Sequence, residues 1–241
     1  MLFASNGCTI EIGSTITLAG VDLTEASFSG QTWTNIAQVE NLGSFGDTAS
    51  EITFDSLSGN RTLRLKGTRN AGSLDLVCGI DAVDAGQIAA VAAERTVYDY
   101  AFRVTFTDPP PVKTSAVTIT IAAPGVVSWN AHGLVAGTPV VFSTTGALPT
   151  GLTAGTTYYV SATGLTTNSF SVSATSGGAA ITTSGTQSGT HTATTAPVAS
   201  RRLFAAKVAS VEETIDAANN VAKNKISLWI NSNVVRVAPL G

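Results

Sequence analysis

The chain contains few charged residues for its length. Of its 241 residues, 12% are Asp, Glu, Lys or Arg, which is about half the share that is usual in soluble proteins. The 13 basic and 16 acidic residues give a formal net charge of −3, so no overall basic character favours nucleic-acid binding. Two interpretations remain open: a surface that other proteins largely cover, or a Thr- and Ser-rich β surface without charges.

Cysteine and long apolar runs are also scarce. The two cysteines, Cys8 and Cys78, do not make a disulfide scaffold, and we expect free thiols. No run of 18 apolar residues predicts a membrane span, and residues 1–10 lack the basic start and apolar core of a signal peptide. We therefore expect a chain that is made and folded in a cytoplasm and does not enter a membrane.

Residue types that carry catalysis are sparse. The two histidines, His132 and His191, lie in a segment without Cys, Asp or Glu, so neither a metal site nor a Ser-His-Asp arrangement is favoured. Glu212 and Glu213 are adjacent and would point to opposite faces of a strand, which argues against paired-carboxylate chemistry. No phosphate-binding loop is present. We expect no enzyme activity, no metal and no cofactor.

A sharp change in composition divides the chain. Three consecutive prolines, which cannot continue a strand ladder, precede Lys113, the only charged residue between positions 109 and 200. We therefore predict an inserted domain at 109–197 and a discontinuous host domain at 1–108 and 198–241. An insertion at the tip of a hairpin is tolerated well, because the chain ends that it joins already lie close together.

Period-two alternation predicts strands through the host domain. Two long runs, Tyr98–Phe106 and Arg202–Ala209, become one hairpin if the insert is lifted out. Each is expected to bury one face and to leave a sheet edge that needs a partner. The segment Gln31–Glu40 fits a helix or a strand. The other predicted strands are Cys8–Ile12 and Ser14–Ala19 with a turn at Gly13 between them, Glu51–Phe54, Arg61–Gly67 with a turn at Thr68–Gly72 after it, Ser73–Ile80 and Asn224–Val237.

One short helix is predicted after these strands. Asp84 is a good N-cap, and Gln87 follows three residues later in a capping-box arrangement. The residues of the apolar stripe that we expect to cover a sheet are Ile88, Val91, Ala92 and Arg95.

Short strand-like runs alternate with Gly- and Pro-containing turns in the insert, and this pattern predicts a second β domain. Its predicted strands are Val117–Ile121, Val126–Trp129, Val140–Ser143, Thr157–Ala162, Ser169–Ser173 and Thr190–Ala193. The whole chain is therefore predicted to be mainly β, with one short flanking α-helix and an inserted small all-β domain.

Several host segments occur in a recognisable order and spacing. They are Val39–Asp47, Ile52–Phe54, Arg64–Gly72, the helix at Asp84–Glu94 and the strand at Tyr98–Thr107. Over residues 1–108 and about 198–241, this pattern resembles the major tail tube proteins of long-tailed bacteriophages. The insert is similar to a small β module of many phage virion proteins; the matching segments are His132–Leu134, Gly155–Val160 and Gly185–His191.

The resemblance implies a fold, an assembly and partners. The host domain would be a tail-tube β-sandwich or barrel, and six copies would form a ring whose inner strands join into one β-barrel. Stacked rings would form a non-contractile tail tube in the virion, through which DNA is ejected without specific binding. A tape measure protein and tail terminator or tip proteins would be its partners.

Two sets of candidate site residues follow for a tube. Each basic contact adds affinity for phosphate, so we expect an acidic lumen; its candidates are Glu11, Asp99, Glu212 and Glu213. The loop at Asn41–Ser50 is the candidate for contacts between stacked rings, although an ordinary surface loop would have the same sequence. Its candidate contact residues are Asn41, Leu42, Gly43, Ser44, Phe45, Gly46 and Asp47.

The alternative function is adhesion to host-surface glycans through the insert. Trp129, Tyr158 and Tyr159 could stack on sugars, but packing in the core of a small β domain also explains them. The host domain carries a local basic cluster as well, which predicts an exposed strand face or ion-pair partners for a neighbouring subunit. Its members are Arg61, Arg64, Lys66 and Arg69.

Overall fold

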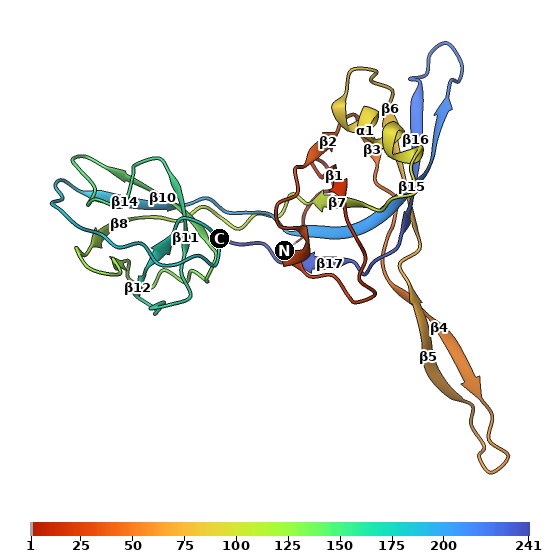
Figure 1. Ribbon diagram of the computed structural model, residues 1–241, viewed down its shortest axis with the longest axis horizontal. Helices are drawn as coiled ribbons and strands as arrows, with labels where there is room; N and C mark the ends of the chain where they lie inside the picture. Colours follow the sequence, from red (N-terminus) through yellow and green to blue (C-terminus); the bar gives the residue numbers. More distant parts are fainter. Residues whose placement is uncertain (1) are drawn as a thin grey trace. The chain divides into compact units, whose positions relative to one another are not determined.

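The computed structural model describes residues 2–241 and divides into two compact units (Figure 1). The eight-stranded unit contains residues 4–106 and 201–237, and the insert unit contains residues 2–3, 107–200 and 238–241. The sequence assigned those ends to the host domain. The C-terminal end joins the insert unit instead, because Val198 and Leu240 exchange backbone hydrogen bonds of 2.7 and 2.9 Å. No helix among residues 2–241 is long and apolar enough to span a membrane.

The eight-stranded unit is built on one antiparallel sheet. Its order is β2, β1, β7, β15, β16, β6 and β3, and β17 adds to β15 beside this path. The strands are β1 (Thr9–Thr15), β2 (Thr34–Ile36), β3 (Val39–Asn41), β6 (Ser73–Gly79), β7 (Tyr100–Thr105), β15 (Arg201–Thr214), β16 (Lys223–Ile230) and β17 (Val235–Val237).

The chain itself brings the two ends of this sheet together. Only Ala37 and Gln38 separate β2 from β3, and Gln38 turns the chain with a φ of 58°. Gly79, at the end of β6, donates its N–H to the Gln38 carbonyl at 2.9 Å. The sheet therefore nearly closes into a barrel around one apolar core. The largest fully buried side chains of this core are Ile10, Ile36, Leu74, Leu76, Phe102, Phe204, Ile226 and Leu228.

The two strands of the predicted long hairpin, β7 and β15, bury both of their faces where they pair with each other. Phe102 lies opposite Phe204 with ring centroids 5.8 Å apart, and both face the barrel core. Ala101 lies opposite Ala205 on the other face, in a second apolar cluster with side chains from residues 16–33. The expectation of one buried face is wrong here, because the segment before β2 covers the outer face of these strands.

β1 continues through Gly13, where the sequence predicts a turn between two strands. A Cβ at Gly13 would lie 2.7 Å from the Gln31 side-chain oxygen and 3.3 Å from the Trp33 ring. Glycine therefore lets the covering segment lie close against the strand. The same Gln31 oxygen accepts hydrogen bonds from the Ser14 N–H at 2.8 Å and from the Ser14 hydroxyl at 2.7 Å.

The helix α1 (Ala85–Glu94) begins at the predicted cap, since the Asp84 carboxylate accepts a hydrogen bond from the Gln87 N–H at 2.8 Å. The predicted buried face is wrong, because Ile88 is 54% exposed. A Cβ at Gly86 would lie 2.1 Å from the Asn35 carbonyl oxygen of β2. This close approach requires small residues toward the sheet and turns Ile88 outward. The buried helix residues are Gly86, Gln87, Ala90 and Ala93.

The insert unit is a separate β fold with a single sheet order of β12, β9, β8, β14, β10, β11 and β13. Its strands overlap all of the predicted runs, so the prediction of a mainly β chain is confirmed in both units. The strands are β8 (Thr114–Ile119), β9 (Val127–Ser128), β10 (Pro139–Thr144), β11 (Thr157–Val160), β12 (Ser169–Phe170), β13 (Val172–Ser173) and β14 (His191–Thr195). The core of this unit includes Val140, Phe142, Val160 and Phe170.

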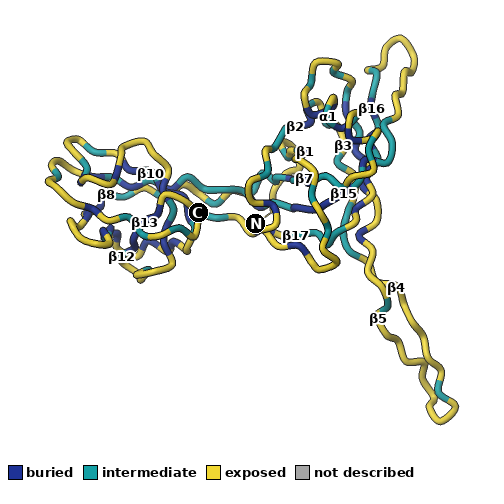
Figure 2. The backbone as a smooth tube through the Cα atoms, viewed as in Figure 1, coloured by how far each residue is buried: buried dark blue, intermediate teal, exposed yellow. Residues whose placement is uncertain are grey.

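The remaining strands, β4 (Thr48–Phe54) and β5 (Leu63–Asn70), form a two-stranded sheet of their own. Every residue of these two strands is exposed except Gly67, and the hairpin extends away from the eight-stranded sheet (Figures 1 and 2). The turn predicted at Thr68–Gly72 begins later, because Asn70 still pairs with Thr48.

Candidate assembly surface

The β4–β5 hairpin presents an apolar face to solvent. Ile52 lies directly opposite Leu65, and Phe54 lies directly opposite Leu63. These four side chains are between 51% and 62% exposed. Two-stranded hairpins are marginally stable in water without a packing partner, and clustered exposed apolar side chains indicate an interaction surface. This face is therefore the strongest candidate for a functional surface in the chain.

The reverse face of the hairpin is charged. Glu51 lies opposite Lys66, and Arg64 forms an ion pair with Glu51 at 2.9 Å. Thr53 is the neutral member of this face, opposite Arg64. One face of the hairpin thus suits water, and the other suits an apolar partner.

Ion pairs hold the base of the hairpin. Arg69 lies 2.8 Å from the Asp47 carboxylate and 3.6 Å from the Asp22 carboxylate. All three residues line a cavity of about 380 Å³ beside β16. Exposed ion pairs contribute about 0–1 kcal/mol each, so this contact orients the hairpin more than it stabilises the fold.

In the loop predicted at Asn41–Ser50 to contact a stacked ring, the candidate contact residues Asn41–Asp47 lie against the sheet of their own subunit. Phe45 packs on the barrel core with its ring centroid 5.5 Å from that of Phe204, and Leu42 packs there too. A Cβ at Gly43, which has a φ of 67°, would lie 2.5 Å from the Asp75 carbonyl oxygen. The apolar side chains of this loop therefore serve the subunit, and the exposed apolar surface begins just after it. In the sequence, apolar residues alternate with polar ones along β4 and β5, and this alternation indicates that one face of the hairpin is apolar.

Two of the four acidic lumen candidates are ion-paired within the subunit. Glu11 binds Arg103, one contact being 2.7 Å, and the Arg103 guanidinium lies 4.7 Å from the centre of the Trp33 ring. The Asp99 carboxylate lies 3.2 Å from the Lys207 ammonium and accepts a hydrogen bond from the Asn231 amide at 2.7 Å. Both carboxylates are less than one fifth exposed, so neither offers a free negative charge to a lumen.

The other two candidates, Glu212 and Glu213, lie near the exposed end of β15. Glu212 is opposite Lys225, and Glu213 is opposite Asn224. Adjacent strand residues point to opposite faces, so Glu212 and Glu213 do not share a face. Glu11 and Asp99 are held in ion pairs of their own, and the structure therefore does not bring the four predicted acidic residues together. Glu212 and Glu213 remain the exposed members of that set.

The outer face of β6 and β16 is a second exposed surface. Trp229 is 59% exposed there. The Ser227 hydroxyl donates to the Asp75 carboxylate at 2.6 Å, and the Lys225 ammonium lies 3.0 Å from it. Hydrogen bonds from Ser227 and then Lys225 hold the pKa of Asp75 below its ordinary value. The charges of this face are balanced in pairs.

The proposed sugar-stacking residues of the insert are mostly in its core. Trp129 and Tyr158 are 8% and 5% exposed, and both belong to the apolar cluster of the insert unit. The Tyr158 hydroxyl accepts a hydrogen bond from the Thr153 N–H at 2.8 Å. The glycan-stacking interpretation is wrong for these two residues, because their rings are covered by protein. Tyr159 alone is partly exposed.

The two histidines have structural partners in the insert unit. The Nδ1 atom of His132 accepts a hydrogen bond from the Leu134 N–H at 2.9 Å, which stabilises the turn there. The Nδ1 and Nε2 atoms of His191 lie 2.8 Å from the Thr144 hydroxyl and 3.0 Å from the Gln187 amide oxygen. Within residues 2–241, no cluster of three or more His, Cys, Asp or Glu side chains could hold a metal ion.

Comparison with known proteins adds no family assignment. No protein-family model matches the chain, and no curated protein matches it.

Proposed function

We propose that the chain is a structural subunit of a phage tail tube, which assembles into stacked hexameric rings that conduct DNA during ejection. The observation that supports this proposal best is the exposed apolar face of the β4–β5 hairpin. A hairpin with this composition requires a covering partner. The sequence resemblance to tail tube proteins favours further copies of the same chain as that partner.

A second feature also supports self-association. β7 pairs with β15 only from Arg201 to Ala206, whereas β15 continues to Thr214. Among the described strands, none pairs with this side of β15 beyond Ala206. An unpaired edge is a template for a strand of another chain. β7 is thus paired within the subunit along its whole length. The open edge is the far end of β15, beyond Ala206.

The low charge of the chain agrees with a subunit that neighbours cover. An interior wall that carries the exposed Glu212 or Glu213 would repel DNA and leave it free to move. The tape measure protein and the terminator and tip proteins would then contact the ends or the interior of the tube.

Adhesion through the insert is the less favoured function. Its candidate aromatic platform consisted of Trp129, Tyr158 and Tyr159, and two of these three side chains are buried.

Electron microscopy of the purified protein tests the proposal. We expect rings or filaments from the native chain. Ile52→Asp should abolish them, because a charge on the apolar face cannot be buried without a partner, whereas Thr53→Asp, on the reverse face, should leave them intact. Monodisperse monomers of the native chain at high protein concentration would refute the proposal.

A further inference from the structure

The chain contains a single Asn-Gly pair, Asn6–Gly7, and both of these residues are exposed. The Cys8 N–H donates to the Ser5 carbonyl at 3.1 Å, so Asn6 and Gly7 are the two central residues of a tight turn. Gly7 has a φ of 86°, a value that glycine adopts readily at the third position of such a turn. The backbone of this turn therefore depends on glycine after Asn6.

The peptide group between Asn6 and Gly7 is the one that the turn leaves unbonded. The hydrogen bond of the turn joins residues 5 and 8, on either side of this central peptide group. Within residues 2–241, no hydrogen-bond acceptor is paired with the Gly7 N–H. Because glycine has no Cβ, the Asn6 side chain can approach the Gly7 nitrogen without obstruction.

The turn lies just outside the paired part of the sheet. β1 begins at Thr9, which pairs with Thr105 of β7, and the side chain of Ile10 is fully buried. Changes near a chain end are tolerated where the affected backbone is exposed and outside the strand ladder. A covalent change at residues 6 and 7 would therefore leave the register of β1 intact.

We propose that Asn6 is a site of spontaneous deamidation in the folded chain. The Gly7 nitrogen loses its proton and attacks the carbonyl carbon of the Asn6 side chain, and the new C–N bond closes a five-membered succinimide ring. The C–N bond of the side-chain amide breaks, and its nitrogen takes up a proton and leaves as ammonia. Water then adds to one of the two ring carbonyls and opens the ring, which gives aspartate or isoaspartate.

The product carries one more negative charge than the starting chain. A carboxyl group is ionised at neutral pH, so the formal net charge changes from −3 to −4. The reaction needs only the chain and water, and it is therefore independent of the proposed assembly.

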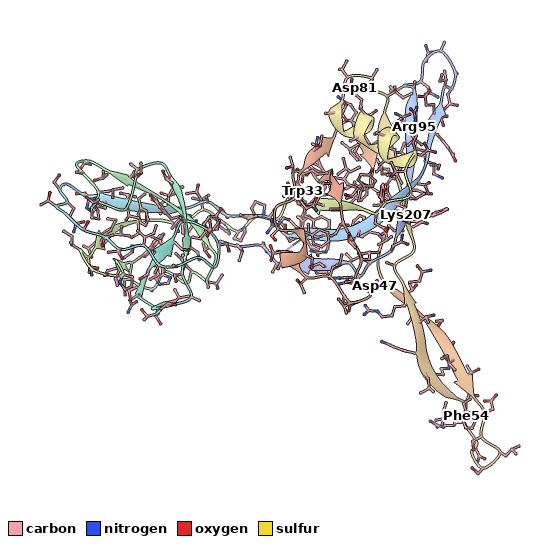
Figure 3. All side chains as sticks on the ribbon, in the orientation of Figure 1. Trp33, Asp47, Phe54, Asp81, Arg95 and Lys207 are labelled. Atoms are coloured by element: carbon pink, nitrogen blue, oxygen red, sulfur yellow. The ribbon has the colours of Figure 1, made fainter. Side chains whose placement is uncertain are left out.

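Three other exposed asparagines provide internal controls: Asn60, Asn219 and Asn220. Asn60 lies in the loop that connects β4 and β5, beyond Phe54 along the hairpin (Figure 3). The other two lie in the loop that connects β15 and β16. Each of the three is followed by a residue other than glycine, so the controls match Asn6 in exposure and differ in the neighbour that hinders the attack.

Incubation of the folded chain at mildly alkaline pH tests the proposal, with tandem mass spectrometry of its peptides to measure conversion at each asparagine. Because only glycine leaves the attacking nitrogen unhindered, we expect conversion at Asn6 to be at least about tenfold faster than at the three controls. Asn6→Gln keeps an exposed amide but would have to close a six-membered ring. The acidic variant that isoelectric focusing detects in the native chain should therefore be lost from Asn6→Gln.

Three outcomes would overturn the proposal. The first is conversion at Asn6 that is no faster than at the controls. The second is conversion in urea but not in the folded chain, because the turn would then protect Asn6. The third is an acidic variant that persists in Asn6→Gln, which would place the modification at another residue. None of these measurements depends on rings or filaments, so each result leaves the tube proposal unchanged.

Discussion

Gln87 joins the two ends of the barrel sheet through its side-chain amide. The NH₂ group donates to the Gly79 carbonyl at 2.9 Å and to the Ala37 carbonyl at 3.3 Å. The amide oxygen accepts hydrogen bonds from the Asp81 N–H and the Asn224 side chain, both at 3.1 Å. Since Gln87 is 4% exposed, these four bonds connect the helix with three separate segments of the sheet in a site that water does not reach.

We expect Gln87→Leu to lower the free energy of unfolding by about 2–4 kcal/mol, because it leaves buried donors and acceptors without partners. Urea unfolding of the dissociated subunit measures this change. Ile88→Leu, at the neighbouring exposed position, is the control and should change stability by less than about 0.5 kcal/mol. Equal effects of the two substitutions would contradict the closing role of Gln87.

The Asp75 carboxylate gives a pH-dependent prediction. Its pKa is lowered in the folded state by Ser227 and then by Lys225, so its contribution to stability is present above the pKa of the unfolded chain and is lost as the pH falls through the lower folded value. The effect on stability is small because the pair is exposed to solvent. In NMR titrations, Ser227→Ala should raise the pKa of Asp75 toward its ordinary value. An unchanged pKa would show that the hydroxyl is not the main cause.

At the residue scale, the sequence predicted the cap of α1 but not the role of Gln87. The Asp84 cap is local, since acceptor and donor are three residues apart. The partners of Gln87 come from residues 37, 79 and 224, which meet only when the sheet closes. The burial of Trp129 and Tyr158 could not be predicted for the same reason, because the strands that cover their rings come from distant parts of the insert.

At the scale of elements, the β4–β5 hairpin differs from every other pair of strands because no core supports it. We expect its amides to exchange rapidly with solvent in the dissociated subunit and to become protected in the assembly, because marginal hairpins open readily until they are packed. Hydrogen exchange measured by mass spectrometry on both forms checks this. β7, paired on both sides, is the internal control and should be protected in both forms. A hairpin that is equally protected in both forms would contradict the role proposed for it.

Alternation along the chain predicted most strands, but it could not show which of them lacked a covering layer. Ile52 and Phe54 alternate with polar residues as Phe102 and Val104 do, yet only the second pair is buried. The difference arises from the placement of the strands, which is not a local property. The exposure of Ile88 is likewise not a local property, because the contact between Gly86 and β2 determines which face of the helix is buried.

At the scale of the whole molecule, the insert enters and leaves the eight-stranded unit at one point. Thr105 of β7 lies directly opposite Arg201 of β15. Replacement of residues 107–199 by Asn-Gly, a favoured two-residue hairpin turn, should therefore leave a folded unit that still assembles. Electron microscopy and circular dichroism of the shortened chain measure both properties. A folded but monomeric product would show that the insert takes part in assembly.

The exposed hairpin also has a consequence for the kinetics of growth. An unassembled subunit exposes the apolar face of the β4–β5 hairpin, and a hairpin without a packing partner is only marginally stable. Its ordering is favourable where a receiving surface already exists. In the proposed assembly, the first few copies have no such surface, whereas the end of a growing polymer always presents one. Growth of the proposed tube should therefore show a lag that short preformed seeds remove, so that free subunits accumulate until a template begins each tube.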